Sequence, residues 1–235
     1  ISVLADAKRN SEALARQRRG RGGLRAAVSP DDPAIVDAVE FRNEMEWRLS
    51  WGDGKSLEDR GDFDGAVTRH RTWLRERSVG GTKDDLRVAF SWAALGRCVS
   101  LAGRTEEGLQ VLQEGRARAV TELGRTHEAT RWFLTEQAQV HSRAGDHHAE
   151  VVALSELHAD EVAALGEDGR ETILTLANLA LAYDSLSEPD QARRFAELAI
   201  SGAARAFGPD DPFTQRRRDA LASILPNDDD KPTPS

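Results

Sequence analysis

The segment 176-LANLALAYDSLSEPDQARRFAELAI-200 decides the fold, because it contains two apolar patterns with helical spacing and a turn between them. In the first half, Leu176, Leu179, Ala180 and Tyr183 follow one another at steps of three or four residues, as on one face of an α-helix. The same spacing returns in the second half at Ala192, Phe195, Ala196, Ala199 and Ile200. The segment therefore predicts two helices joined by a turn near Ser187.

This helix pair recurs along the chain with a period of 42 residues. Three columns share the period: Gly124, Gly166 and Gly208; Thr130, Thr172 and Thr214; and Gly61, Gly103 and Gly145, with Ser187 in the fourth place. Agreement of three independent columns by chance is improbable, so the chain is predicted to be a repeat protein. Each second helix is expected to end at a glycine of the first column, since glycine is a natural helix C-cap.

The repeat resembles the tetratricopeptide repeat in its order of large apolar residue, Leu, small residue, aromatic residue and then Ala after the turn. The ordinary repeat has about 34 residues, whereas the connectors LGRTHEAT, LGEDGRET and FGPDDPFT lengthen this one to 42. In this it is similar to the kinesin light chain variety. The resemblance implies an all-α, right-handed superhelical solenoid of antiparallel helix pairs. It also implies a scaffold that binds proteins or peptides in a concave groove.

The repeats divide the chain into four predicted regions. Residues 1–28 form a basic arm with a weak helix pattern, 29–60 a capping region with a helix over Pro33–Trp51, 61–225 the solenoid, and 226–235 a disordered acidic tail. The solenoid holds three full repeats and flanking half repeats. Small residues at Gly96, Ala138 and Ala180 are expected where helices cross closely.

The middle repeat is the least regular. Glu150 stands in the column of the small residues Gly108 and Ala192, and Gln137 stands in the column of Leu179.

Charge and composition narrow the class of partner. The chain has a net charge of −8; residues 1–28 carry seven basic and two acidic side chains, so the remainder carries 25 basic and 38 acidic ones. An acidic body argues against nucleic acid and favours a protein or peptide of basic or amphipathic character. No aromatic residue interleaves the arginines of the arm, so we interpret it as a linker rather than an RNA-binding segment.

Composition also indicates the cellular location and the source of the protein. A single cysteine, Cys98, excludes an intrachain disulfide and a cysteine-based metal cluster, which favours a reducing cytoplasm. No apolar run reaches the roughly 18 residues of a membrane helix, so a soluble protein without membrane contact is expected. Lysine supplies only four of the 32 basic residues, an arginine bias that we associate with a GC-rich, bacterial genome.

Two motifs offer chemistry, and both have a simpler interpretation. GDGKS at 52–56 is similar to the end of a phosphate-binding loop, but the required earlier glycine is Leu49, so a helix-ending turn is the better interpretation. A metal site, and with it an enzyme on a helical solenoid, has its least implausible ligands in His141, His148, His158 and Asp146. Since two of these histidines occupy the columns of Tyr183 and Ile200, we predict no cofactor, metal or catalytic residue.

The candidate binding residues lie on the first helix of each pair, which lines the concave side of such a solenoid. Counted by spacing, the predicted groove consists of Phe90, Arg97, Trp132, Glu136, Gln139, Arg143, Leu174, Asn178, Leu181 and Asp184. Trp132 is the expected anchor, because tryptophan is enriched in binding hot spots. Asn178 matches the asparagine that the resemblance implies holds a peptide main chain.

Two alternatives stay open. The chain is also consistent with a sensor or regulatory segment of a larger signalling NTPase or transcription regulator, and its sequence does not decide whether copies of it associate.

Overall fold

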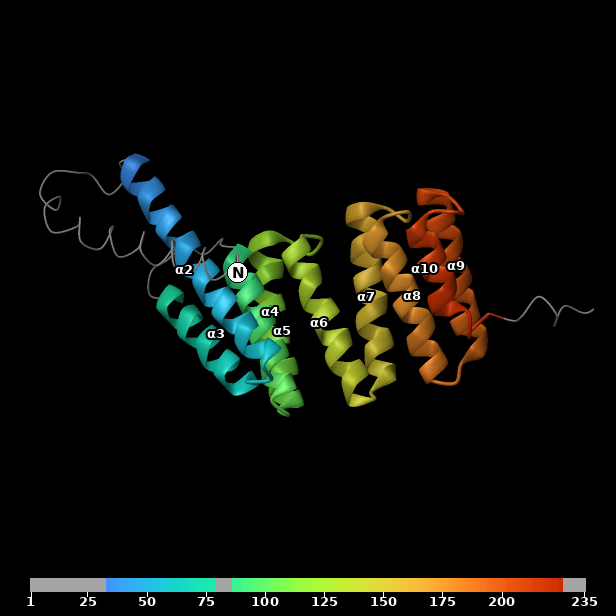
Figure 1. Ribbon diagram of the computed structural model, residues 1–235, viewed down its shortest axis with the longest axis horizontal. Coiled ribbons are helices and arrows are strands. Elements are labelled where there is room, and N and C mark those ends of the chain that lie inside the picture. The colour runs from blue at the N-terminus through green and yellow to red at the C-terminus, as the bar shows by residue number, and fades with distance from the viewer. Residues whose placement is uncertain (1–32, 79–85, 226–235) are drawn as a thin grey trace, which may run out of the picture. The chain divides into compact units, whose positions relative to one another are not determined.

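The computed structural model describes residues 33–78 and 86–225, and these residues form helices without any strand (Figure 1). The helices are α2 (Pro33–Asp59), α3 (Phe63–Ser78), α4 (Leu86–Leu101), α5 (Thr105–Leu123), α6 (Glu128–Ala144), α7 (His147–Leu165), α8 (Arg170–Ser185), α9 (Pro189–Phe207) and α10 (Pro212–Leu221). The predicted all-α class is confirmed. The predictions for the arm 1–28, for 29–32 and for the tail 226–235 lie outside the described residues.

The chain divides into two compact units, residues 1–82 and 83–235. In the first unit α2 packs against α3, and Ala66 and Trp73 of α3 are buried. The prediction that α2 ends at Trp51 is wrong, because the helix continues through 52–56 to Asp59. Gly54 is buried, and a Cβ atom there would lie 2.7 Å from His70 Nε2. This glycine therefore permits a close helix crossing, and neither a turn nor a phosphate-binding loop exists at GDGKS.

The second unit consists of the pairs α4–α5, α6–α7 and α8–α9, followed by α10. The turn inside each pair needs a left-handed residue, and Gly103 and Gly145 supply it with φ of +85° and +72°. Ser187 adopts φ +58° in the third pair, so the fourth member of this column keeps the conformation without being glycine. The column found in the sequence is thus a column of helix-pair turns.

The connector between pairs explains the other two columns. Gly124, Gly166 and Gly208 end α5, α7 and α9 with φ of +91°, +82° and +101° and ψ near 160°, a region open essentially to glycine alone. Six residues later, a fully buried threonine hydroxyl donates to the carbonyl oxygen of that glycine: Thr130 at 2.8 Å, Thr172 at 2.9 Å and Thr214 at 2.8 Å. Each connector is therefore closed by the same glycine–threonine clamp.

A close helix crossing lies at one of the predicted small residues, Gly96. A Cβ atom on Gly96 would lie 2.5 Å from Leu112 Cγ, and Ala138 and Ala180 are buried. Helix α10 ends at Leu221, before the predicted end of the solenoid at residue 225, and Ala222 is exposed. Among the described helices, none is both long and apolar enough to span a bilayer.

Candidate functional site

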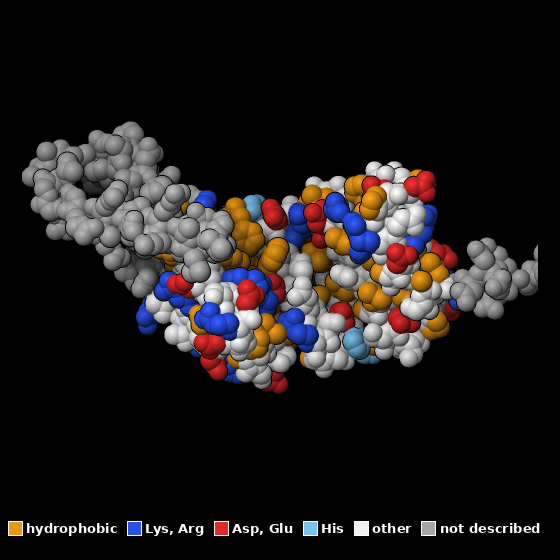
Figure 2. All heavy atoms as spheres, viewed as in Figure 1, with side chains coloured by type: hydrophobic (Ala, Val, Ile, Leu, Met, Phe, Trp, Pro, Cys, Tyr) orange, Lys and Arg blue, Asp and Glu red, His pale blue; other side chains and the backbone are white. Residues whose placement is uncertain are grey.

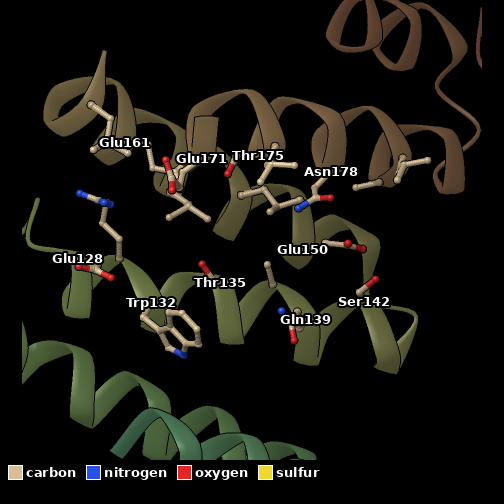
Figure 3. Close-up of a pocket in the computed structure, with 18 of the residues that line it drawn as sticks. Glu128, Trp132, Thr135, Gln139, Ser142, Glu150, Glu161, Glu171, Thr175 and Asn178 are labelled. Carbon is tan, nitrogen blue, oxygen red and sulfur yellow. The ribbon is translucent and has the colours of Figure 1, made fainter. Parts of the chain in front are cut away.

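The candidate site is a groove between α6 and α8 whose floor is α7. Helix α4 packs against α6 and α10 packs against α8, but α6 and α8 have little or no direct contact. The space between them forms a cavity of about 780 Å³ that all three helices line. On the face seen in Figure 2, hydrophobic side chains are exposed between charged ones over this part of the molecule. In Figure 3, Trp132, Thr135 and Gln139 of α6 lie across the groove from Thr175 and Asn178 of α8.

The groove opens within the repeat that is least regular in sequence. Glu150, at the column of Gly108 and Ala192, lines the groove near the start of α7. Its carboxylate lies 2.8 Å from Nδ1 of His147, so a polar pair replaces the tight contact that Gly108 makes with Gly96 in the preceding pair.

Three large apolar side chains give the groove its exposed hydrophobic surface. Trp132 is 39% exposed, Leu165 42% and Leu181 43%, and all three line the cavity. Leu154 and Leu157 of α7 are buried beneath them and complete the floor. Clustered exposed apolar residues rimmed by polar ones are typical of interaction sites.

Trp132 is held in place by contacts from α4 and α6. Its indole N–H donates to Glu136 Oε1 at 2.9 Å, and Arg97 donates to the same oxygen at 2.5 Å. Phe90 packs edge to face against the indole, with ring centroids 5.8 Å apart. The side chain is therefore fixed before any partner binds, which reduces the entropy lost on binding.

The polar lining of the groove is acidic. Four carboxylates (Glu128, Glu150, Glu161 and Glu171) line it against one guanidinium, that of Arg131. Figure 3 places Glu128, Glu161 and Glu171 toward one end of the groove and Glu150 with Ser142 toward the other.

Glu161 is the unusual member of this set. It is only 5% exposed, and its Oε2 has no hydrogen-bond partner among the described residues. Burial raises the pKa of Glu161, while a hydrogen bond from the Thr175 hydroxyl and the charge of Arg131 oppose that rise. No cationic group in the described part of the chain forms an ion pair with it; the Arg131 guanidinium instead donates to the Thr126 carbonyl at 2.6 Å.

The predicted groove residues separate into three groups. Trp132, Gln139, Leu174, Asn178 and Leu181 line the cavity. Three further predicted residues lie behind the tryptophan: Phe90, Arg97 and the buried Glu136. Arg143 and Asp184 are exposed and lie outside the cavity. Helical spacing therefore selected residues on helices that line the cavity, but it did not distinguish the wall of the cavity from the layer that supports it.

The floor residues of α7 were missed in the sequence. Glu150, Glu161 and Leu165 belong to a second helix, which the solenoid pattern assigns to the other side of the molecule. The irregularity at Glu150 was the one available signal, since a carboxylate in a column of small residues does not serve close packing.

The three histidines considered as metal ligands lie in different surroundings. His141 Nδ1 lies 3.7 Å from Asp146 Oδ2, and Asp146 caps α7 by accepting from the Ala149 N–H at 3.1 Å. His148 is exposed, whereas His158 is half-buried and its pKa is lowered by that burial, with Glu167 opposing. Within 86–225, no three histidine, cysteine or carboxylate groups lie close enough to share an ion.

Comparison with known proteins supports the fold. Residues 172–213 match the family model described as tetratricopeptide repeat. A putative kinesin light chain with nearly identical TPR-like repeats from Podosopora anserina superposes with a TM-score of 0.64 at 17% identity, covering 78% of this chain and 85% of that one. BtubC (BKLC) from P. vanneervenii gives a TM-score of 0.68 at 16% identity, covering 95% and 83%. No curated protein matches this chain.

Proposed function

Because the chain carries a tetratricopeptide repeat within a kinesin light chain-like helical solenoid, we propose that it is a binding scaffold whose groove between α6 and α8 holds a peptide segment of a partner protein. The observation that carries the proposal is the pre-positioned Trp132, exposed beside Leu165 and Leu181 in a groove. Repeats of this kind generally mediate protein interactions. We place the binding region within 61–225 and the protein in the cytoplasm.

The chemistry of the groove specifies the partner. An apolar surface with an excess of carboxylates complements a segment that is basic and amphipathic. Asn178 and Gln139, on opposite walls, offer amide groups that can donate to and accept from a peptide main chain. The proposed ligand is therefore a short segment with apolar anchors, polar main-chain contacts and at least one cationic side chain.

The test uses a displayed library of short random peptides selected on the full chain, with binding of the enriched peptides measured by fluorescence anisotropy. Truncating a central aromatic anchor costs about 2 kcal/mol or more, so Trp132→Ala is expected to weaken binding roughly thirtyfold. Helix content measured by circular dichroism is expected to stay unchanged.

Leu181→Ala and Leu198→Ala form a matched pair of variants. The two leucines are equally exposed, at 43% and 42%, but only Leu181 lines the groove. Leu181→Ala is expected to weaken the peptide about fivefold and Leu198→Ala to leave it unchanged. Peptides that bind equally well to all of these variants would place the site elsewhere and refute the groove assignment.

A further inference from the structure

We propose that the end of the groove around Glu161 and Glu171 is a subsite for one cationic side chain of the partner, preferably an arginine; this rests on the proposed function. The defining observation is a buried carboxylate with one oxygen that has no partner among the described residues. The two acids belong to different helices, α7 and α8, and both line the cavity.

An unpaired buried carboxylate is costly, because the charge loses its water without gaining a counter-ion. Two other buried carboxylates of this unit avoid that state. Glu136 is paired with Arg97, and Asp160 with Arg116 and Arg125. Each of them also has an oxygen without a hydrogen bond, but a guanidinium neutralises the charge. Glu161 differs because no guanidinium of the described residues forms an ion pair with it: Arg131 acts on its charge without pairing and donates instead to the Thr126 carbonyl.

The surroundings of Glu161 match what a guanidinium requires. A guanidinium bound to Glu161 would find a second carboxylate in Glu171, which is exposed at the rim of the groove. The Thr175 hydroxyl donates to Glu161 and so orients its carboxylate. Glu128 adds a third negative charge at the same end. A guanidinium presents several N–H donors in one plane and is less strongly hydrated than an ammonium, so arginine is preferred over lysine where the acceptor is buried.

The apolar anchors sit next to this subsite. Trp132, one turn after Glu128 on α6, and Leu165, one turn after Glu161 on α7, flank the acidic end. A partner segment that places an apolar residue on Trp132 therefore brings its neighbouring residues to Glu161. The specificity expected from this arrangement is an apolar residue followed or preceded at short distance by arginine.

The first experiment compares two displayed peptide libraries selected on the full chain, one containing all amino acids and one without arginine, lysine and histidine. Strong enrichment is expected from the complete library only. Suppose that the library without arginine, lysine and histidine yields peptides that bind equally tightly and depend on Trp132. That result would overturn the subsite and leave the proposed function intact. Absence of Trp132-dependent binders from both libraries would refute the proposed function itself.

The second experiment is a double-mutant cycle with an enriched peptide. Glu161→Gln in the chain and arginine→citrulline in the peptide each remove one charge and little volume. Each change alone is expected to weaken binding about tenfold, and the two together no more than either alone. The matched control Asp184→Asn, an exposed acid of α8 outside the cavity, is expected to change affinity less than twofold.

Three outcomes contradict the subsite. Losses that simply add in the cycle show that Glu161 does not contact the arginine. An equal effect of Asp184→Asn, or equally tight binding of free spermine, shows a diffuse acidic surface instead. Retained Trp132 dependence together with indifference to Glu161→Gln restricts the failure to the subsite.

Discussion

Asp160 and Glu161 are neighbours on α7 and are almost equally buried, at 4% and 5% exposure, yet they lie in opposite electrostatic environments. Asp160 faces α5 and its connector, where Arg125 Nε lies 2.5 Å from Oδ1 and Arg116 lies 3.7 Å from Oδ2. Asp160 in turn raises the pKa of Arg125. Glu161 faces the groove, where Arg131 acts on it electrostatically but no described cation forms an ion pair with it. On the side of α7 that faces α5, the buried carboxylate is thus neutralised by ion pairs. On the side that faces the groove, the buried carboxylate has no ion pair, as expected of a surface that binds a partner.

The largest expected effect on stability comes from removing the ion pairs of Asp160. Asp160→Asn removes the negative charge that Arg116 and Arg125 share; Asp160 is buried although Arg125 is more than half exposed, and loss of a hydrogen bond to a charged group typically destabilises by about 1.5–3 kcal/mol. We expect a clearly lower denaturation midpoint in urea, followed by circular dichroism. The exposed Asp184→Asn serves as control. If the midpoint falls no further than that of the control, the ion pairs of Asp160 with Arg116 and Arg125 contribute nothing to stability.

The same isosteric change one residue later is expected to act in the opposite direction. Glu161→Gln removes an unpaired buried charge, so we expect stabilisation of about 1 kcal/mol at pH 7, or a rise in Tm of roughly 2–4 °C for a chain of this size. Stability gained while affinity is lost is typical of functional sites. A loss resembling that of Asp160→Asn would mean that Glu161 is paired within the chain.

A pH series sharpens this comparison. Since burial raises the pKa of Glu161 above the ordinary 4.5, the folded state holds its proton to higher pH than the unfolded state does. Stability therefore falls as pH rises through the window between 4.5 and the raised value. The Tm advantage of Glu161→Gln is expected to be full at pH 7 and to shrink as pH falls toward 4.5. A constant advantage across that range would rule out titration of Glu161 as its cause.

The smallest effect concerns His158, also on α7. Burial lowers its pKa below the ordinary 6.5, so the unfolded state binds the proton more readily and stability falls as pH drops below 6.5. His158→Ile, which introduces the residue of the equivalent position 200, is expected to reduce the Tm loss between pH 7 and 5.5 by roughly 1–2 °C. Thermal melts in the Glu161→Gln background isolate the effect, with exposed His148→Asn as control. An unchanged pH profile would contradict it.

The fold was largely predictable because its determinants are local. Gly124, Gly166 and Gly208 were recognised as helix ends from spacing alone, and each has the positive φ that glycine permits. The error at GDGKS has a tertiary cause: Gly54 was interpreted as a turn residue, but it serves the approach of His70 from another helix. Local rules assign glycine to turns, whereas packing also places it at crossings.

The groove was predictable only in part. Trp132 and Leu181 followed from helical spacing, but the separation of α6 from α8 depends on how three helices pack together. Glu161 carries no signal of its own in the sequence, where it is one acid among 40. Its distinction is the absence of an ion pair among the described residues, which depends on the three-dimensional surroundings.

The glycine–threonine clamp has a consequence for how such a chain can be altered. Thr130, Thr172 and Thr214 each close a connector through the main chain of a glycine, and none of these threonines lines the groove. The stretch from one threonine to the next behaves as an exchangeable cassette. Replacing 130–171 by 172–213 is expected to keep the glycine–threonine clamp at each joint while it substitutes the walls of the groove, so the binding specificity can be changed within the same framework.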